Sequence, residues 1–169
     1  MVRAERADDP AELAAIRAVV RRAFGQDDEA VLLDALRADP AWLPGLALVA
    51  LLGPDPDGPA VGHVAGTRLD VGGRPAVALA PLAVDPEHQR RGVGTALVKA
   101  QLAAARDRGE VLVVVLGEPG YYRRFGFRPA HELGITGPYD EAGDAFQAVS
   151  LADGPAPTGW ATYAAAFGA

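Results

Sequence analysis

Residues 76–95 read AVALAPLAVDPEHQRRGVGT, and this stretch decides the fold. Its apolar part, 76–84, predicts a strand. A polar loop follows, and the apolar spacing over Val93–Arg108 then predicts a helix covered on two sides. The β-branched run Val111–Leu116 predicts a buried strand. Strand, loop, helix and strand form a βαβ unit, so we expect the two strands to be parallel.

The residues around this unit predict further strands and helices, and therefore an α/β (α+β) domain with a largely antiparallel sheet. In a helix that we expect to start near Asp27 or Asp28, the apolar residues Val31, Leu32, Ala35 and Leu36 should be buried. The tail Gly154–Ala169 gives no clear prediction. The other expected elements are strand Val2–Glu5, a helix from Pro10 to Phe24 with N-cap Asp9 and capping-box Glu12, a second helix that starts near Asp27 or Asp28 and stops at Pro40, strands Leu46–Leu52 and Ala60–Val71, a short helix Gly120–Phe125, and strands at Phe127 and Ala145–Leu151.

Composition bounds the class of protein. The 169 residues correspond to about one domain, so we expect one domain over residues 1–169. The chain has no cysteine, which excludes disulfides and thiol nucleophiles. The net charge of −6 argues against nucleic acid as a partner. Neither a secretory signal nor a membrane-spanning run is evident, so we expect a cytoplasmic protein. His63, His88 and His131 lack metal-ligand spacing, and we expect no metal.

The loop before the long helix has the properties of an anion site. The first N–H groups of a helix lack partners, and the helix dipole is positive there. Gly92 and Gly94 let a diphosphate approach the backbone, and Arg90 and Arg91 add positive charge. A polar turn without a ligand is the alternative. The loop matches neither the dinucleotide fingerprint, because Leu97 replaces the third glycine, nor a phosphate-binding Walker loop.

Pro81 indicates what lies beside this loop. Proline within an inner strand lacks a donor for the sheet, which implies a bulge or an unpaired stretch. If the strand separates from its parallel neighbour at Pro81–Val84, an extended ligand with amide groups can pair there. Its diphosphate would then lie on the glycine loop. Coenzyme A, with its pantetheine arm, has this combination of groups.

These residues resemble a known family. The pattern Gln89-x-x-Gly92-x-Gly94 after Leu82-Ala83-Val84 resembles motif A of the GNAT N-acetyltransferases. Residues 116–127, LGEPGYYRRFGF, resemble motif B and a bacterial subgroup of predicted acetyltransferases. The resemblance is specific over about Ala76–Pro129. It implies the GNAT fold, a mixed, mostly antiparallel sheet that splays between central parallel strands and is flanked by helices.

The resemblance also implies roles for individual residues. Acetyl-CoA would be the acyl donor, and Tyr122 matches the tyrosine that points at the sulfur of coenzyme A. A tyrosine hydroxyl can protonate the departing thiolate, and a backbone N–H near Val84 can stabilise the oxyanion. Packing against the coenzyme or the core is the alternative for Tyr122. The residues expected to hold the donor are Leu82, Ala83 and Val84 for the pantetheine arm and Gln89, Arg90, Arg91, Gly92, Val93, Gly94 and Thr95 for the diphosphate.

The general base is less clear, because the strand before the loop has no carboxylate where many GNAT enzymes have a glutamate. Glu118, at the end of a strand, is the best-placed candidate, and Asp85, His63 and Asp70 are weaker ones. Trp42, and Trp160 with Tyr163, could line an acceptor pocket, although packing elsewhere is the simpler interpretation. These alternatives remain open in the sequence.

We therefore expect direct transfer of an acetyl group from acetyl-CoA to a primary amine, on a small molecule or a peptide. A non-catalytic acyl-CoA-binding sensor or partner module is the alternative, which the missing strand carboxylate favours. A weaker rival is an unrelated protein that shares only the phosphate-binding loop. Homodimers are common among the relatives that the resemblance suggests, and nothing in the sequence requires one.

Overall fold

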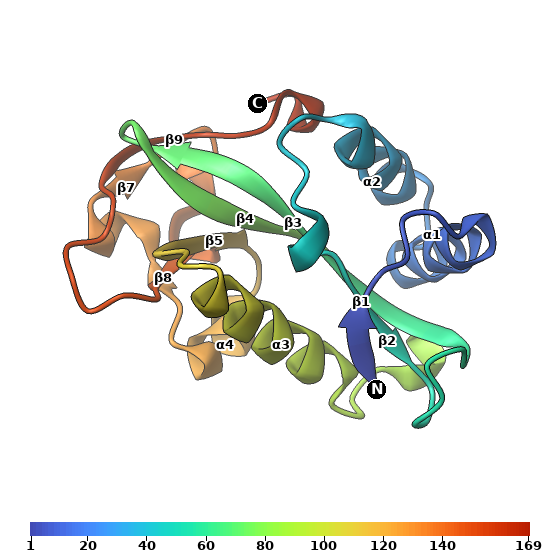
Figure 1. The fold of residues 1–169 in the computed structure, drawn as a ribbon. Coiled ribbons are helices and arrows are strands. Elements are labelled where there is room, and N and C mark those ends of the chain that lie inside the picture. The colour runs from blue at the N-terminus through green and yellow to red at the C-terminus, as the bar shows by residue number, and fades with distance from the viewer.

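The computed structural model describes residues 1–169, and a nine-stranded sheet runs through it with helices on both faces (Figure 1). The strands are β1 (Val2–Ala4), β2 (Leu48–Leu51), β3 (Ala60–Val71), β4 (Arg74–Val84), β5 (Leu112–Leu116), β6 (Arg128–Pro129), β7 (Ile135–Thr136), β8 (Phe146–Ser150) and β9 (Gly159–Thr162). The helices are α1 (Pro10–Phe24), α2 (Asp28–Ala38), α3 (Val93–Asp107) and α4 (Pro119–Tyr122). No helix is long and apolar enough to cross a membrane.

The sheet has the predicted topology. Its main path runs β1-β2-β3-β4-β5-β8-β6, and along it only β4 and β5 pair in parallel, with Val77 opposite Val113 and Leu79 opposite Val115. Helix α3 connects these two strands, as expected of a βαβ unit. The expected mixed, mostly antiparallel sheet is therefore confirmed, and the parallel pair lies at its centre.

The two faces of the sheet carry different helices. Leu97, Val98 and Leu102 of α3 pack on one face, and Ile16 of α1 and Leu33 of α2 pack on the other. The predicted buried face of α2 was partly wrong. The helix buries Ala30, Leu33 and Leu36, whereas Val31 is 55% exposed and Ala35 is also exposed. Helix α2 has apolar residues on all of its sides, so their spacing alone does not show which side packs on the sheet.

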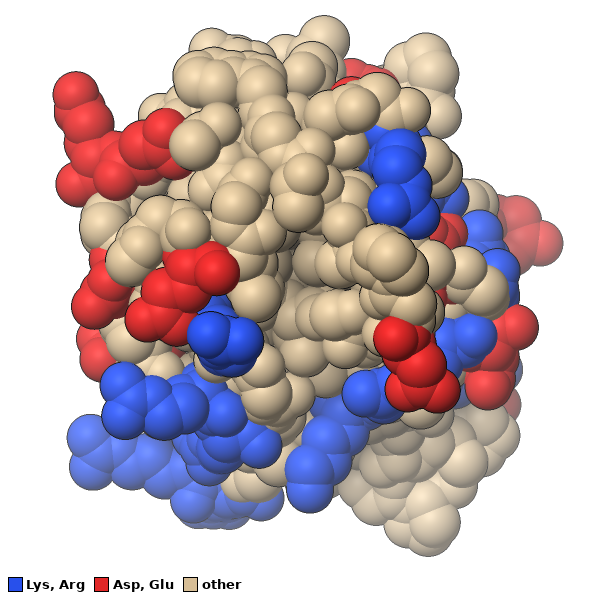
Figure 2. All heavy atoms as spheres, turned by 90° about the vertical axis from the view of Figure 1, so that its left-hand side faces the viewer, with Lys and Arg blue, Asp and Glu red and all other residues tan.

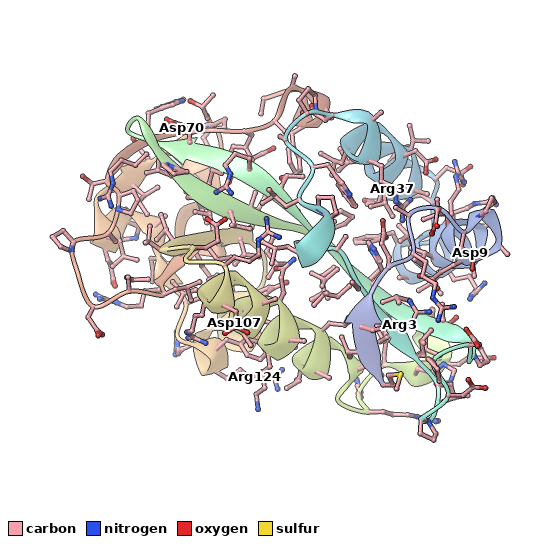
Figure 3. The ribbon with its side chains drawn as sticks, viewed as in Figure 1. Arg3, Asp9, Arg37, Asp70, Asp107 and Arg124 are labelled. Carbon is pink, nitrogen blue, oxygen red and sulfur yellow. The ribbon has the colours of Figure 1, made fainter.

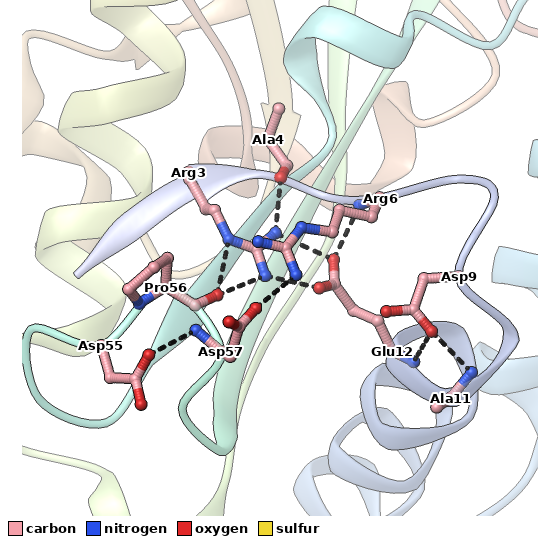
Figure 4. Close-up of polar contacts among 9 residues, drawn as sticks. All are labelled: Arg3, Ala4, Arg6, Asp9, Ala11, Glu12, Asp55, Pro56 and Asp57. Carbon is pink, nitrogen blue, oxygen red and sulfur yellow. Dashed lines mark hydrogen bonds and ion pairs between the residues drawn. The ribbon is translucent and has the colours of Figure 1, made fainter.

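Ion pairs fix the start of the chain against the β2–β3 loop (Figure 4). Arg3 pairs with Glu12 and donates to the carbonyl oxygen of Pro56. Asp9 caps α1 as predicted, accepting from the backbone N–H of Ala11 at 3.0 Å. Glu12 does not close the expected capping box; it accepts instead from the N–H of Arg6 at 2.7 Å. The neighbouring arginines draw this carboxylate away from the cap.

Two polar residues, His63 of β3 and Glu5, are buried in contact with each other. His63 is fully buried, and its Nε2 lies 2.6 Å from Oε2 of Glu5, which also accepts two hydrogen bonds from Arg37 of α2 (labelled in Figure 3). Burial alone would raise the pKa of Glu5, but hydrogen bonds from His63 and Arg37 outweigh it and lower that pKa to about 2. Burial lowers the pKa of His63 against the pull of Glu5. The pair is therefore a neutral histidine hydrogen-bonded to a carboxylate at neutral pH.

The tail Gly154–Ala169, which has no clear sequence pattern, contains a strand that forms by long-range pairing. Strand β9 pairs antiparallel with the end of β3 and parallel with β7. The pairing of β9 with β3 brings the backbone of Thr158 close to Gly72. Only glycine leaves room for this contact, because a Cβ on Gly72 would lie 2.0 Å from the carbonyl oxygen of Thr158. The chain then continues as a 3-10 turn, Ala165–Phe167, whose Ala166 N–H donates to Asp39 at 3.1 Å. The tail thus reaches from the sheet to the end of α2 (Figure 1).

Candidate active site

Strands β4 and β5 diverge at the centre of the sheet. Their pairing ends at Leu79 and Val115, although β4 continues to Val84. The register between β3 and β4 shifts here, since Val64 opposes Leu82 whereas Gly66 opposes Leu79, which leaves one extra residue in β4 around Pro81. Each strand keeps its outer partner, β3 or β8. The predicted bulge and separation at Pro81 are therefore confirmed.

The backbone of β4 beyond this point presents unpaired groups to the gap. In an antiparallel ladder, alternate residues direct their N–H and C=O groups to the same side. The N–H of Asp85 donates to Val61 on β3 at 2.8 Å. Ala83, two residues earlier, therefore also faces β3, and Leu82 and Val84 face the gap. The Val84 carbonyl oxygen is in fact reached there by Nε2 of Gln89 at 3.1 Å.

Two adjoining clefts follow the divergence. One, of about 450 Å³, is lined by Leu79–Leu82 of β4 and Val114–Glu118 at the end of β5, and Tyr122 also borders it. The other, of about 470 Å³, lies at the start of α3. Leu82 lines both clefts, so an extended ligand can pass from one to the other along the edge of β4.

The second cleft contains most of the predicted diphosphate residues. Its lining includes Leu82, Val84, Gln89, Arg90, Gly92, Val93, Gly94 and Thr95. Ala83 and Arg91, also expected at the donor site, line neither cleft. Gly92 begins α3 with φ +84° and supplies no side-chain cap, so the first N–H groups of the helix remain open to a ligand.

The shape of this loop is set by its backbone. Arg90 has φ +60° and is the only residue other than glycine in the left-handed region. Such conformations cluster at ligand-binding sites, where the surrounding structure maintains them. A Cβ on Gly94 would lie 2.6 Å from the hydroxyl of Tyr121, so glycine is needed for this approach.

Two arginines, Arg90 and Arg124, line the second cleft although the chain is acidic overall, and no acidic residue does. Arg124, on its lining, lies 4.2 Å from the ring centroid of Tyr121 and donates from Nε to the Tyr121 carbonyl oxygen at 3.0 Å. Figure 3 labels Arg124 near α4. Figure 2 shows, on one face of the molecule, that Lys and Arg side chains gather towards its lower part, so the charge is unevenly distributed. Local positive charge beside a helix N-terminus suits a phosphate.

Tyr122 lies at the wall of the first cleft. Its ring packs against Gly117, where a Cβ would lie 2.4 Å from Cε2, and edge-to-face against Phe127 with centroids 5.5 Å apart. The residue is only 7% exposed. Burial, with a smaller contribution from Tyr121, raises the pKa of its hydroxyl well above the ordinary value. The hydroxyl is therefore protonated at neutral pH and can donate a hydrogen bond into the cleft.

The carboxylate candidates differ in position. Glu118 lines the first cleft, where it caps α4 by accepting from the N–H of Gly120 at 3.3 Å. Asp85 pairs instead with Arg22, His63 is buried against Glu5, and Asp70 accepts from Gly73 in the β3–β4 turn (labelled in Figure 3). None of these three lines either cleft. Glu118 is thus the only one of the four candidates at the site.

The far wall of the first cleft was largely missed by the sequence interpretation. It comes from Phe24, Glu29 and Leu32 at the α1–α2 turn and α2, and from Tyr139, Tyr163 and Phe167. Of these residues, only Tyr163 is an acceptor-pocket candidate from the sequence. Trp160 is 55% exposed and outside the lining, and Trp42 packs beneath Arg37 at 5.8 Å from the ring centroid. No local motif marks this wall, because long-range pairing of β9 assembles it.

The structure gathers no group of three or more His, Cys, Asp or Glu side chains placed to hold a metal ion. A donor site of open backbone groups and a protonated tyrosine instead suits a thioester with a diphosphate.

Known proteins share this sequence and fold. A sequence model described as "Acetyltransferase (GNAT) domain" matches residues 6–130. The chain is 38% identical over 152 residues to the uncharacterized N-acetyltransferase YhbS of Escherichia coli K12, covering 88% of this chain and 87% of that protein. It is 40% identical over 136 residues to the uncharacterized N-acetyltransferase YjhQ of the same strain, covering 78% and 73%.

Solved structures agree. The crystal structure of Escherichia coli YhbS in complex with CoA superposes with a TM-score of 0.88 at 34% identity, covering 100% of this chain and 92% of that chain. A GNAT family acetyltransferase from Brucella melitensis in complex with acetyl-CoA gives 0.78 at 33% identity, covering 99% and 97%. From its sequence, its fold and the form of its central cleft, the chain belongs to the GNAT N-acetyltransferase family and is an acetyltransferase.

Proposed function

We propose that the protein transfers the acetyl group of acetyl-CoA to a primary amine directly, with both substrates bound. The observation that carries the proposal is the divergence of β4 and β5 beyond Leu79, which opens a cleft bordered by Tyr122 and continuous at Leu82 with the open start of α3. The two similar structures solved with CoA and acetyl-CoA support the same donor.

The donor would bind along β4. Leu82 and Val84 direct their backbone groups to the gap, so the pantetheine amides can pair with them as an added strand would. The diphosphate would lie at the N–H groups of the residues from Gly92 to Thr95, with Arg90 and Arg124 supplying positive charge. Ala83, whose backbone faces β3, would support this edge without binding the ligand itself.

The chemistry needs a nucleophile, an oxyanion donor and an acid. The amine nitrogen attacks the thioester carbonyl, and a backbone N–H of the β4 edge near Val84 stabilises the oxyanion. The C–N bond forms, the C–S bond breaks, and Tyr122 donates its proton to the thiolate. Glu118 accepts the proton that the amine loses, directly or through water. Glu118, which lines the cleft, would thus take the role of the carboxylate that β4 lacks.

Replacing Tyr122 by Phe tests this proposal. We expect kcat for acetyl transfer to fall by about 100-fold, because a positioned acid contributes roughly that factor. The Kd for acetyl-CoA, measured by calorimetry, should change less than about twofold, because Phe keeps the packing against Gly117. An unchanged kcat would remove Tyr122 from catalysis.

The donor is tested separately by calorimetry with acetyl-CoA, ADP and NAD at equal concentrations. We expect acetyl-CoA to bind at least tenfold more tightly (about 1.4 kcal/mol). Equal affinities would mean that the loop recognises phosphates alone, which would overturn the donor assignment.

A further inference from the structure

The acceptor side of the first cleft is mostly apolar and aromatic. Of the 17 residues that line the whole first cleft 13 are hydrophobic, and on the acceptor side these include Phe24, Leu32, Tyr139, Tyr163 and Phe167, which favours an apolar substrate. Tyr139 and Tyr163 meet edge-to-face with centroids 5.0 Å apart, and Tyr163 meets Phe167 in the same way at 5.4 Å. The three rings form one continuous wall, which we name the aromatic wall. A flat or branched apolar group gains contact area against such rings.

The charges in the cleft have one sign. Glu29 and Glu118 line it, and no Lys or Arg does. A substrate carboxylate or phosphate would therefore meet two negative side chains without a cation to balance it, which is costly in a partly enclosed site. Glu29 is half-buried, and Nε2 of Gln26 lies 3.0 Å from one of its oxygens and 3.1 Å from the other. That contact holds the carboxylate in place.

The aromatic wall lies after the residues that the GNAT sequence model matches. The GNAT sequence model matches residues 6–130, whereas Tyr139, Tyr163 and Phe167 all follow it. They reach the cleft because β9 pairs with β3 and because Ala166 is bonded to Asp39 at the end of α2. The wall is therefore built mainly by the C-terminal segment, whereas the donor site is built by β4, the loop after it and α3.

We propose that the acceptor is a primary amine on a compact aryl or branched alkyl body that carries no acidic group. Its apolar body would pack against the aromatic wall, and Glu29 would attract its ammonium group and so act as a specificity-determining residue. This inference rests on the proposed function. Two carboxylates are too few for a polycation, and the absence of a basic residue disfavours amino acids.

A matched pair of acceptors tests the substrate class. Tyramine and L-tyrosine differ only by the α-carboxylate, and kanamycin represents polycationic amines. We expect kcat/KM, followed by release of free CoA thiol, to be at least about tenfold higher for tyramine than for either of the others. Equal or higher kcat/KM for tyrosine or kanamycin would overturn the inference while leaving acetyl transfer itself established. If acetyl-CoA bound but no amine were acetylated, the proposed function would fail, and this inference with it.

Variants test the two residue assignments. Phe167→Ala should raise KM for tyramine about fivefold and leave KM for ethylamine within twofold, because ethylamine is too small to need the wall. Trp160→Ala is the matched control, since it removes an exposed aromatic side chain from the same tail. Equal effects of Phe167→Ala on both amines would overturn the role of the wall.

Glu29→Gln should raise KM for tyramine about threefold or more with kcat unchanged, which is the pattern of a residue that attracts substrate without taking part in the reaction. Asp28→Asn is its control, because Asp28 is an exposed acidic residue in the same turn of α2 and lies outside the cleft. An unchanged KM in Glu29→Gln, or the same increase in both variants, would exclude Glu29.

Discussion

The donor side and the acceptor side of the cleft are built in different ways. The donor side comes from one continuous stretch, from the end of β4 to the first turn of α3, plus Tyr121, Tyr122 and Arg124 around α4. The acceptor side joins α1 and α2 to residues more than 100 positions later in the chain. A site made of one loop keeps its geometry through local backbone conformation, whereas a site made of distant segments depends on tertiary contacts. The first can be shared by many proteins, and the second can differ in each.

The largest effect that would separate the two sides is expected for Gly94→Val. The new side chain would collide with the hydroxyl of Tyr121, whose ring is held by Tyr122, Phe125 and Arg124. We expect the Kd for acetyl-CoA to rise about 100-fold or more, which corresponds to about 2.7 kcal/mol. Calorimetry measures it. Gly154→Val is the control, because nothing lies within 4 Å of a Cβ there. Wild-type affinity in Gly94→Val would show that the donor does not approach this turn.

A smaller effect is expected from a matched pair of glycines. Gly92 and Gly25 have φ +84° and +70°, and a Cβ at either meets nothing within 4 Å. Alanine at each should cost about 1 kcal/mol of conformational strain and lower Tm by about 2–4 °C. Only Gly92→Ala should also weaken acetyl-CoA binding, by about fivefold, because only Gly92 lies on the donor loop. Equal affinities of the two variants for acetyl-CoA would contradict the special role of this turn.

The smallest expected effect is a change of stability with pH that depends on His63. This residue lies on β3, the strand that pairs with β4 on the donor side and with β9 on the acceptor side. The folded pKa of His63 is lowered, so its contribution to stability is present above the unfolded pKa of about 6.5 and is lost as pH falls below that value. Lowering the pH from 7 to 5 should therefore reduce Tm. His63→Gln should weaken this dependence in thermal melts.

The control for this experiment is His131→Gln, which replaces an exposed histidine next to Asp144. It should keep the wild-type dependence of Tm on pH. The Glu5 carboxyl adds a second loss at lower pH, since its pKa is lowered to about 2 and the unfolded value is about 4.3. A pH profile of His63→Gln that matched the wild type between pH 7 and 5 would assign the loss to other groups.

The contrast also explains what the sequence could predict. Pro81 predicted the bulge, and β3 was predicted with its observed bounds, because each depends on local chemistry. The anion site predicted from Gly92 and Gly94 stays a prediction. The roles of Tyr122 and Glu118 came from a motif and remain predictions, although both residues line the cleft. One domain spanning all 169 residues also stays a prediction.

Other features were beyond sequence patterns. Glu29, Tyr139 and Phe167 carry no motif, and their meeting depends on β9 pairing with the end of β3. The buried side of α2 was ambiguous because apolar residues surround the helix. Ala83 and Arg91 adjoin predicted donor residues yet line neither cleft, since neighbouring residues along a strand or a turn point to opposite sides. In each case, whether a residue lines a cleft or is buried depends on contacts with residues distant in sequence or on the direction of the backbone.

The outward-facing amides of Leu82 and Val84 have a consequence for solvent exchange. Because β4 and β5 stay attached to their outer strands, the gap between them exists before any ligand arrives. These two amide protons should therefore exchange with deuterium much faster than that of Ala83, although all three residues lie in the middle of the protein sheet. If adding the acyl donor slows exchange at the amides of Leu82 and Val84 alone, the donor has formed hydrogen bonds to this edge of β4 as a neighbouring strand would.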